Sequence, residues 1–371
     1  MKKLLFGAIM IVLFLNSCHD PEPFNQKTNR RMARQMQNEL DDYVTGFAEV
    51  PGAWLSVTMD EGYTELVSGY GNKASFQRLS VTSEFRISSI TKMFTSVVIF
   101  QMVEEGSIDL SDNIFEILGR QLLTGLQAEE AIDRITIKDL LRHTSGIEDY
   151  VALNWTTTLL TDPLRFWEPQ DLLDYVKEHS IAQFEPGTNY YYSDTNYVLL
   201  GLIIEKLLNK PIHKAYEDRI LQPLKMDHTY MEAYESGDDN NLASGYFENN
   251  HLNNWNTSSD WSGGGLVSTL ADLSIFMKAL TNGRLFGKRS SFRDMQEWIV
   301  LNNKSAYGFG VGKYNIGGHE VIGHGGQGFG FTSGLYYYPE KNAILCLAVN
   351  QQATDISGFE EAVIRIINDF N

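Results

Sequence analysis

Hydrophobic positions follow a strand-like period near both ends of the chain and a helical period between them. The expected strands are residues 53–59, 65–70, 318–322, 331–338 and 344–349. Helices are expected at residues 30–47 and 359–370, and residues 91–277 are mostly helical, with long loops marked by Gly, Pro and Asn. Strands from both ends of one chain can join in one sheet, so the pattern predicts an α/β (α+β) fold. It has an antiparallel sheet built from both chain ends and flanked by helices, a mostly helical second lobe, and a site in the cleft between them.

The first residues look like a targeting segment rather than part of this fold. A basic start is followed by an apolar run over residues 4–15, which is too short to span a bilayer as a stable helix. The run ends in Leu-Asn-Ser-Cys18, which resembles the lipobox of bacterial lipoproteins, where the cysteine carries the lipid. We therefore expect a membrane-anchored lipoprotein at the bacterial cell envelope, on the periplasmic or the extracellular face. Secretion without a lipid is the alternative.

These signals set the expected boundaries of the chain. The predicted parts are a signal peptide over residues 1–17, a lipidated tether over 18–28, and one domain over 29–371 whose helical lobe spans about 91–280.

Composition and charge narrow the possible partners. The 371-residue chain is 43% hydrophobic, which is ample for a large core, and its formal net charge is −17. This charge, without any run of Lys or Arg that could follow a phosphate backbone, argues against a nucleic-acid partner. Of the two cysteines, Cys18 is assigned to the lipid. Cys346 lies in an apolar strand pattern, so we expect a buried packing residue and no disulfide.

The first chemical signal is Ser89-x-x-Lys92, which precedes a long apolar helix pattern ending near Gly106. Positions i and i+3 of a helix share a face, so the hydroxyl and the amine become neighbours. A serine hydroxyl needs a base before it can act as a nucleophile, and a lysine shielded from water can be that base. The alternative is an ordinary helix start with a surface lysine. The apolar surroundings favour a reactive serine, because burial lowers the pKa of a lysine.

Two later segments carry residues that could complete such a site. Tyr192 and Asp194 close a Tyr-rich loop before a helix at residues 198–207, and a phenol beside a buried lysine could act as general base; aromatic packing is the alternative. Residues 323–328, Gly-His-Gly-Gly-Gln-Gly, formally match a dinucleotide fingerprint, but they lead into a strand, so we reject that interpretation. Their glycines instead predict a close approach of substrate to a strand edge whose N–H groups hold an oxyanion. His324 alone could also be structural.

Three of these short motifs together resemble the active-site motifs of the serine β-lactamase and penicillin-binding-protein superfamily. The motifs are Ser89-Ile-Thr-Lys92, Tyr192-Ser193-Asp194 and His324-Gly325-Gly326. The branch most like this chain holds class C β-lactamases, D-Ala-D-Ala carboxypeptidases and family VIII esterases. Stretches at residues 135–146, 223–227 and 263–273 agree, and the resemblance runs from about residue 50 to 350. It implies the β-lactamase/transpeptidase-like fold.

The resemblance also implies roles for individual residues. Ser89 would be acylated by the substrate, and Lys92 and Tyr192 would share its proton and later activate the deacylating water. Backbone N–H groups of Ser89 and Gln327 would form the oxyanion hole. The implied substrate-binding and oxyanion set is Asp194, His324, Gly325, Gly326 and Gln327. His143 and Gly146 would shape a turn behind the site.

Three positions depart from the family pattern. Asp194 replaces the usual Asn, and a carboxylate near Lys92 would favour the protonated amine, which makes Tyr192 the expected base. His324 replaces a lysine, so we expect binding to depend on pH. Gly325 lacks the hydroxyl with which many relatives bind a substrate carboxylate, and this weakens the case for β-lactam or D-Ala-D-Ala specificity.

The sequence thus predicts a serine hydrolase that forms an acyl-enzyme on a peptide or amide bond, D-alanyl-D-alanine carboxypeptidase-like or D-amino-acid peptidase-like, at the cell envelope. A class C-type β-lactamase, a family VIII-type esterase and a non-enzymatic penicillin- or peptidoglycan-binding lipoprotein are the alternatives. The H-E-x-x-H zinc motif and Cys/His clusters of ligand spacing do not occur, so a zinc enzyme is disfavoured and no metal or cofactor is expected. An α/β-hydrolase is disfavoured because the G-x-S-x-G elbow does not occur. The expected partner is a small-molecule or peptide substrate, and the sequence leaves the oligomeric state open.

Overall fold

The computed structural model describes residues 27–179, 181–235, 237, 241–248 and 250–370. The predicted signal peptide, the predicted lipidation site Cys18 and residues 18–26 of the predicted tether lie outside this range. Helix α1 (Lys27–Gly46) begins before the predicted start at residue 30 and takes the last two residues of that tether. In the described part of the chain, no helix is both long and apolar enough to cross a bilayer.

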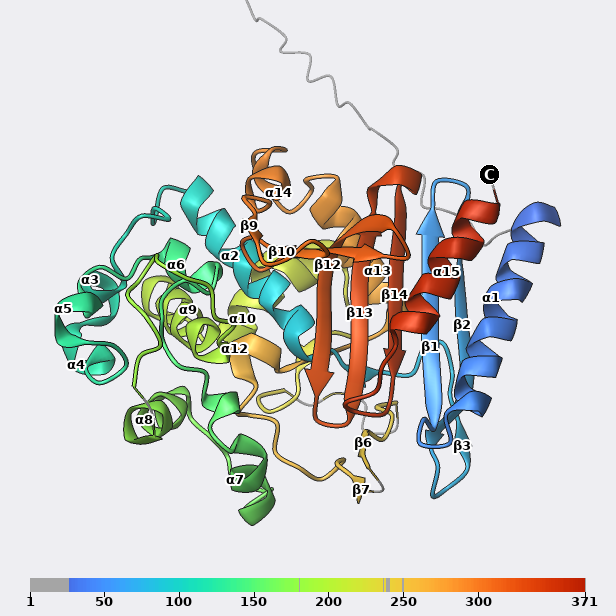
Figure 1. The fold of residues 1–371 in the computed structure, drawn as a ribbon, viewed down its shortest axis with the longest axis horizontal. Coiled ribbons are helices and arrows are strands. Elements are labelled where there is room, and N and C mark those ends of the chain that lie inside the picture. The colour runs from blue at the N-terminus through green and yellow to red at the C-terminus, as the bar shows by residue number, and fades with distance from the viewer. Residues whose placement is uncertain (1–26, 180, 236, 238–240, 249, 371) are drawn as a thin grey trace, which may run out of the picture.

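Strands from both ends of the chain form one antiparallel sheet (Figure 1). Across the described residues its order is β3-β2-β1-β14-β13-β12-β11-β10-β9. The strands are β1 (Gly52–Met59), β2 (Gly62–Asn72), β3 (Gln77–Arg78), β9 (Ile299–Val300), β10 (Ser305–Tyr307), β11 (Gly312–Ile316), β12 (His319–Gly328), β13 (Phe331–Tyr338) and β14 (Ala343–Val349). The N-terminal strand β1 lies directly against the C-terminal strand β14, with Ser56 opposite Cys346. The predicted sheet is therefore confirmed.

Alternating side chains give this sheet two buried faces. Leu55 and Leu347 pack in the same cluster as α1 and the C-terminal helix α15 (Ser357–Asp369), which lie side by side on one face (Figure 1). Trp54 and Cys346 are the neighbours of Leu55 and Leu347 in their strands, and they face the larger core that the sheet shares with the other helices. Because a strand points successive side chains to opposite faces, the apolar run around Cys346 is buried on both sides.

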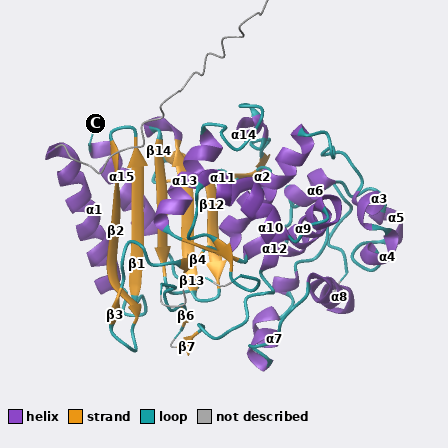
Figure 2. Ribbon diagram, turned by 180° about the vertical axis from the view of Figure 1, so that it is seen from behind, coloured by secondary structure: helices purple, strands orange, loops and turns teal. Residues whose placement is uncertain are grey.

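The middle of the chain forms the helical lobe beside the sheet (Figure 2). The helices of this middle part are α2 (Thr91–Glu104), α3 (Ile114–Leu118), α4 (Arg120–Leu123), α5 (Glu129–Ile132), α6 (Ile137–Leu141), α7 (Trp155–Thr161), α8 (Pro169–His179), α9 (Asp194–Leu208), α10 (Ile212–Tyr216), α11 (Gln222–Leu224), α12 (Trp261–Gly264), α13 (Leu270–Thr281) and α14 (Ser291–Asp294). Of these, α13 packs on the sheet itself, against β1, β13 and β14. Short turns of 3₁₀ or π type are η1 (Ser88–Ile90), η2 (Tyr150–Ala152), η3 (Glu217–Leu221) and η4 (Pro339–Lys341). Short strands pair within the lobe: β4 (Phe85–Arg86), β8 (Leu266–Ser268) and β5 (Tyr230–Met231) in one sheet, and β6 (Tyr246–Phe247) with β7 (Asn250–His251) in another.

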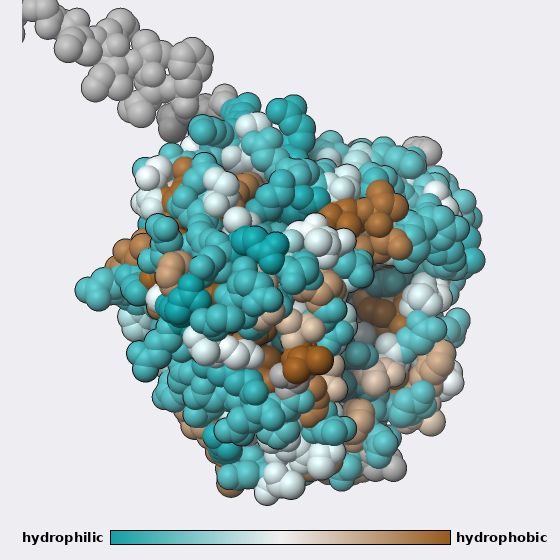
Figure 3. All heavy atoms as spheres, turned by 60° about the vertical axis from the view of Figure 1, so that its left-hand side comes forward, coloured by the Kyte–Doolittle hydropathy of each residue, from teal (hydrophilic) through white to brown (hydrophobic). Residues whose placement is uncertain are grey.

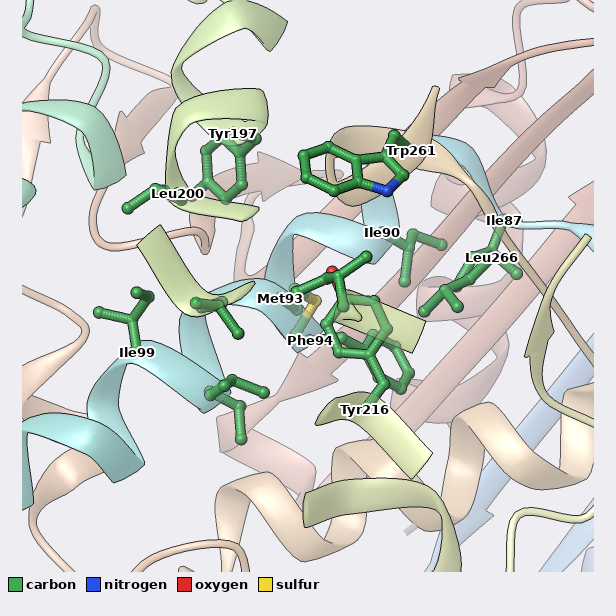
Figure 4. Close-up of a cluster of buried hydrophobic side chains, with 14 of the residues drawn as sticks. Ile87, Ile90, Met93, Phe94, Ile99, Tyr197, Leu200, Tyr216, Trp261 and Leu266 are labelled. Atoms are coloured by element: carbon green, nitrogen blue, oxygen red, sulfur yellow. The ribbon is translucent and has the colours of Figure 1, made fainter. Parts of the chain in front are cut away.

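The segment that carries Ser89 is fixed by distant parts of the chain. Arg86 in β4 pairs with Val267 in β8, which ties the start of the segment to a strand far along the sequence. Helix α2 follows, and apolar side chains on nearly all of its faces are buried; Figure 4 shows Ile90 and Met93 among side chains from other elements. The face of the molecule in Figure 3, in contrast, is mostly hydrophilic with separate hydrophobic patches. Burial on nearly all faces holds α2 in one position, which fixes the site at its N-terminus.

Candidate active site

Ser89 lies in the turn η1, immediately before α2, and Lys92 lies in the first turn of that helix. The Lys92 Nζ is 3.0 Å from the Ser89 Oγ, as the i, i+3 spacing predicted. The Tyr192 hydroxyl reaches the same oxygen from another segment and donates to it at 2.9 Å. The structure thus brings the three residues predicted as catalytic together around one hydroxyl.

Lys92 is fully buried, and its Nζ is surrounded by oxygen atoms. Besides the Ser89 Oγ, it contacts the Gly263 carbonyl oxygen at 2.8 Å and the Asp194 carboxylate. Carbonyl and carboxylate oxygens only accept, so these two contacts use two N–H bonds of Lys92. Toward Ser89, Lys92 presents a third N–H bond when it is protonated and a lone pair when it is neutral. The geometry therefore lets Lys92 take a proton from Ser89.

Tyr192 is positioned by the buried ring of His143. The two ring centroids are 4.3 Å apart, and the His143 Nδ1 accepts a hydrogen bond of 3.1 Å from the Ser193 backbone N–H. Nearby Gly146 has a φ of +72°, and a Cβ on it would lie 1.9 Å from the Phe184 carbonyl oxygen. Both residues therefore shape the chain behind the site, as the resemblance implied.

The protonation of Tyr192 differs from the prediction. Burial raises the pKa of Tyr192 well above its usual value, and the Asp194 carboxylate raises it further, while the hydrogen bond to Ser89 lowers it. The expectation that Lys92 would stabilise a phenolate is therefore not supported, because the Asp194 charge opposes it. Tyr192 rests as a neutral phenol that can relay a proton. Asp194 itself begins α9, whereas the predicted helix started at residue 198.

The glycine segment forms the second half of strand β12 rather than a loop. Residues 319–323 of β12 pair with β11, but residues 324–328 pair only with β13, so their other edge is open. This edge lies against the turn that carries Ser89: a Cβ on Gly326 would be 2.2 Å from the Ile87 carbonyl oxygen. Only glycine permits that approach. The predicted close approach of substrate to this strand edge stays a prediction. Gln327, on the same edge, is exposed beside Ser89 in the pocket lining.

His324 is held inside the protein by both ring nitrogens. Its Nδ1 lies 2.6 Å from the Gly325 carbonyl oxygen, which can only accept, so Nδ1 carries the proton. Its Nε2 is then the acceptor for the Tyr307 hydroxyl at 3.0 Å. Burial lowers the pKa of His324 to about 3, so the ring is neutral at pH 7. The predicted pH dependence through His324 near neutrality is therefore not supported.

Comparison with known proteins agrees with this site. The chain matches the protein family described as Beta-lactamase over residues 40–366. It belongs to the beta-lactamase family. Members of this family are serine hydrolases, so the predicted superfamily and enzyme class are confirmed at that level.

Relatives in this family include proteins of differing length and description. Over 338 residues the chain is 26% identical to Protein flp of Staphylococcus aureus (strain NCTC 8325 / PS 47), covering 86% of this chain but 64% of that protein. The structure resembles a D-amino acid amidase from Ochrobactrum anthropi SV3 complexed with L-phenylalanine amide, with a TM-score of 0.80, 26% identity, and coverage of 91% and 99% of the two chains. It also resembles a D-stereospecific amidohydrolase from Streptomyces sp., with a TM-score of 0.78, 28% identity, and coverage of 90% and 97%. These matches confirm the predicted fold class.

In this member of the beta-lactamase family, two pockets meet at Ser89. The first, here called the apolar pocket, is lined mainly by apolar and aromatic side chains, among them Trp155 and Trp255. The second, here called the polar pocket, runs along residues 324–327 of β12 and is lined by four acidic residues. These are Asp149, Asp194, Asp355 and Glu360. Among the described residues that line either pocket, none is Lys or Arg.

Among the carboxyl groups of the site that were not predicted from the sequence, Asp149 and Asp260 lie nearest the catalytic residues in the chain's hydrogen-bond and charge network. Asp149 accepts a hydrogen bond of 3.1 Å from the backbone N–H of Asp194, and burial together with Asp194 raises the pKa of Asp149 to about 8. Asp260 lies in the apolar pocket, and the same two causes raise its pKa to about 7. Each residue stands beside a stretch that resembles the family, but a single aspartate next to glycines has no spacing that marks it. A search for acidic residues flanking those stretches could have found them.

Proposed function

We propose that the protein is a serine amide hydrolase that acts through an acyl-enzyme on Ser89 and takes amides or peptides of D-amino acids without a free carboxylate on the leaving group. Ser89 Oγ attacks the carbonyl carbon, and its proton passes to Lys92, directly or through the Tyr192 hydroxyl. The same proton then goes to the leaving amine as the C–N bond breaks. Water hydrolyses the resulting ester and returns a proton to Ser89.

Backbone donors would stabilise the oxyanion in both steps. We assign this role to the N–H groups of Ser89 and Gln327, because the open edge of β12 lies against the turn that carries Ser89. Loss of one such donor typically costs about 10²–10³ in rate. The close approach at Gly326 keeps this geometry in place.

The choice of substrate rests on the lack of Lys and Arg among the described residues that line the polar pocket. In the family pattern, a lysine and a hydroxyl at the positions of His324 and Gly325 favour a substrate carboxylate. Here His324 is neutral with both nitrogens bonded internally, and four acidic residues line the described wall of the pocket. A carboxylate entering this pocket would lie near the ionised Asp355 and find no Lys or Arg among the described lining residues. This disfavours D-Ala-D-Ala carboxypeptidase and β-lactamase activity, since both substrates carry a carboxylate.

The related structures support the same choice. A D-amino acid amidase and a D-stereospecific amidohydrolase share the fold over at least 90% of this chain. The amidase structure is complexed with L-phenylalanine amide, an amide of a single amino acid, which has no terminal carboxylate that would need a cation. If Cys18 carries a lipid, this hydrolase would work at the cell envelope.

A matched pair of dipeptides tests the proposal. D-phenylalanyl-D-alaninamide and D-phenylalanyl-D-alanine share the scissile bond and differ in the terminal carboxylate. We expect the wild-type protein to hydrolyse the amide with a kcat/KM about tenfold or more above that of the acid, which corresponds to ~1.4 kcal/mol. Ser89→Ala should hydrolyse neither. Faster cleavage of the acid, or full activity in Ser89→Ala, would contradict the proposal.

A further inference from the structure

Asp260 places a carboxylate without an ion-pair partner in the apolar pocket beside Ser89. The pocket walls are mainly aromatic and aliphatic and include Trp155, Leu159 and Trp255. Asp260 and Asp194 are the carboxylates among the described lining residues, beside neutral polar groups such as those of Thr156 and Gln352. Asp194 is already paired with the buried Lys92. Asp260 is the remaining charge that a ligand in this pocket would meet among the described lining residues.

The backbone around Asp260 leaves its carboxylate uncovered. A Cβ on Gly264 would lie 3.0 Å from the Asp260 Oδ2, and a Cβ on Gly328 would lie 3.3 Å from the same atom. Both positions are glycine, so neither places a side chain over the oxygen. Within the described residues, the Asp260 carboxylate makes no side-chain hydrogen bond or ion pair, although its backbone groups are bonded. The oxygen therefore faces the pocket without a partner.

The basic residues near this carboxylate are engaged elsewhere. Lys92 donates to Asp194, Gly263 and Ser89. Arg86 forms a two-bond ion pair with Glu232, at 2.7 and 2.8 Å. Burial, followed by the Asp194 charge, raises the pKa of Asp260 to about 7, although the charges of Lys92 and Arg86 lower it. A cation brought by the ligand would remove this burial penalty.

We infer that Asp260 binds the free α-ammonium group of the substrate, so that the protein selects amides or peptides whose acyl residue has an unblocked amino group and an apolar or aromatic side chain. The inference rests on the proposed function, because it assigns the acyl residue to the apolar pocket and the leaving group to the polar pocket. One amino-acid residue of the substrate satisfies both features of the pocket, because its ammonium pairs with Asp260 and its side chain packs on the aromatic walls. An N-acylated substrate would leave the carboxylate buried without a partner.

Two anilides that differ only in the amino group provide the test. D-phenylalanine 4-nitroanilide carries the ammonium, and 3-phenylpropionic acid 4-nitroanilide lacks it. We expect a wild-type kcat/KM about 10- to 100-fold higher for the first, the range for a hydrogen bond to a charged group. Asp260→Asn should remove this preference, because kcat/KM for the first substrate falls to the value for the second. Asp355→Asn, the same change on the rim of the polar pocket, is the matched control and should keep the preference.

Each outcome decides the inference. Equal wild-type rates on both anilides would overturn it while leaving the proposed amidase function intact, and a preference that survives in Asp260→Asn would also overturn it. Cleavage of neither anilide by the wild type would contradict both the proposed function and the inference. Labelling of Ser89 by a fluorophosphonate shows whether Asp260→Asn is folded. If Asp260→Asn is not folded, the test is inhibition of the wild-type protein by two compounds that differ in the amino group. The inference requires 2-phenylethylamine to inhibit more strongly than 2-phenylethanol, and equal inhibition overturns it.

Discussion

Gly326→Ala tests whether strand β12 must lie against the turn that carries Ser89. A Cβ at this position would be 2.2 Å from the Ile87 carbonyl oxygen and 2.6 Å from the Ser333 Oγ. The neighbouring Gly325 provides a matched control, because its Cβ would meet nothing closer than the Tyr336 hydroxyl at 3.5 Å. The same chemical change is therefore made twice on one strand, once with a clash and once without.

The size of the effect follows from these distances. An ordinary carbon–oxygen contact is about 3.2 Å, so β12 has to move by about 1 Å away from Ile87. Gln327, the proposed oxyanion donor, is the next residue and would move with the strand. A displacement of about 1 Å at a reacting centre costs roughly 10²-fold in rate. We expect Gly326→Ala to lower kcat by that factor and Gly325→Ala to stay within about threefold of wild type, as for a substitution without a clash.

The assay is hydrolysis of D-phenylalanine 4-nitroanilide, with circular dichroism to compare folding. The rate at which a fluorophosphonate labels Ser89 gives an independent measure of nucleophile geometry. If Gly326→Ala and Gly325→Ala have the same kcat and labelling rate, the close approach of β12 does not control the site, and our assignment of the oxyanion donors is wrong.

Three further substitutions probe charge and backbone. Asp194→Asn keeps an oxygen that can accept from Lys92 and removes a charge, so we expect kcat to be retained or raised; loss of all acyl-enzyme by intact mass would contradict this. Burial raises the pKa of Asp149 from 3.8 to about 8, so the folded protein holds a proton that the unfolded chain releases, and the free energy of unfolding should fall as the pH rises between these values. Asp149→Asn should reduce that fall in urea titrations, and an unchanged pH dependence would refute the assignment. Gly146→Ala places a Cβ 1.9 Å from the Phe184 carbonyl oxygen at a φ of +72°, so a loss of about 1–3 kcal/mol is expected by urea unfolding, and wild-type stability would contradict it.

The sequence predicted the sheet because its pattern is strong where both faces are buried. The run around Cys346 is apolar on every position, and the structure buries it between two cores. The spacing of Ser89 and Lys92 also predicted their contact, since a helix turn alone sets that distance. These features depend on short-range geometry, which the sequence shows directly.

The start of α9 was missed because tertiary contacts override weak helix preference. Thr195 and Asn196 favour turns in isolation, but here the Thr195 hydroxyl donates to the Glu148 carbonyl oxygen and Asn196 accepts from the Ser145 hydroxyl. The helix can therefore begin at Asp194. No local pattern reports such distant partners.

The neutral state of His324 could not be predicted for a similar reason. Its tautomer is fixed by its own neighbour's carbonyl and by Tyr307, which reaches it in space from β10. The pairing of Asp194 with Lys92 was anticipated, but the effect of that charge on Tyr192 depends on their common burial. The protonation states of these side chains therefore could not be predicted without the folded structure.

The most direct test of the central claim is the intact mass of the protein, rapidly quenched in acid during turnover of D-phenylalanine 4-nitrophenyl ester. We predict a mass increase of one D-phenylalanyl group that maps to Ser89 and is retained in Ser88→Ala, the neighbouring serine. The adduct should be absent in Ser89→Ala. Turnover that persists in Ser89→Ala, or an adduct that maps to any other residue, would contradict the account.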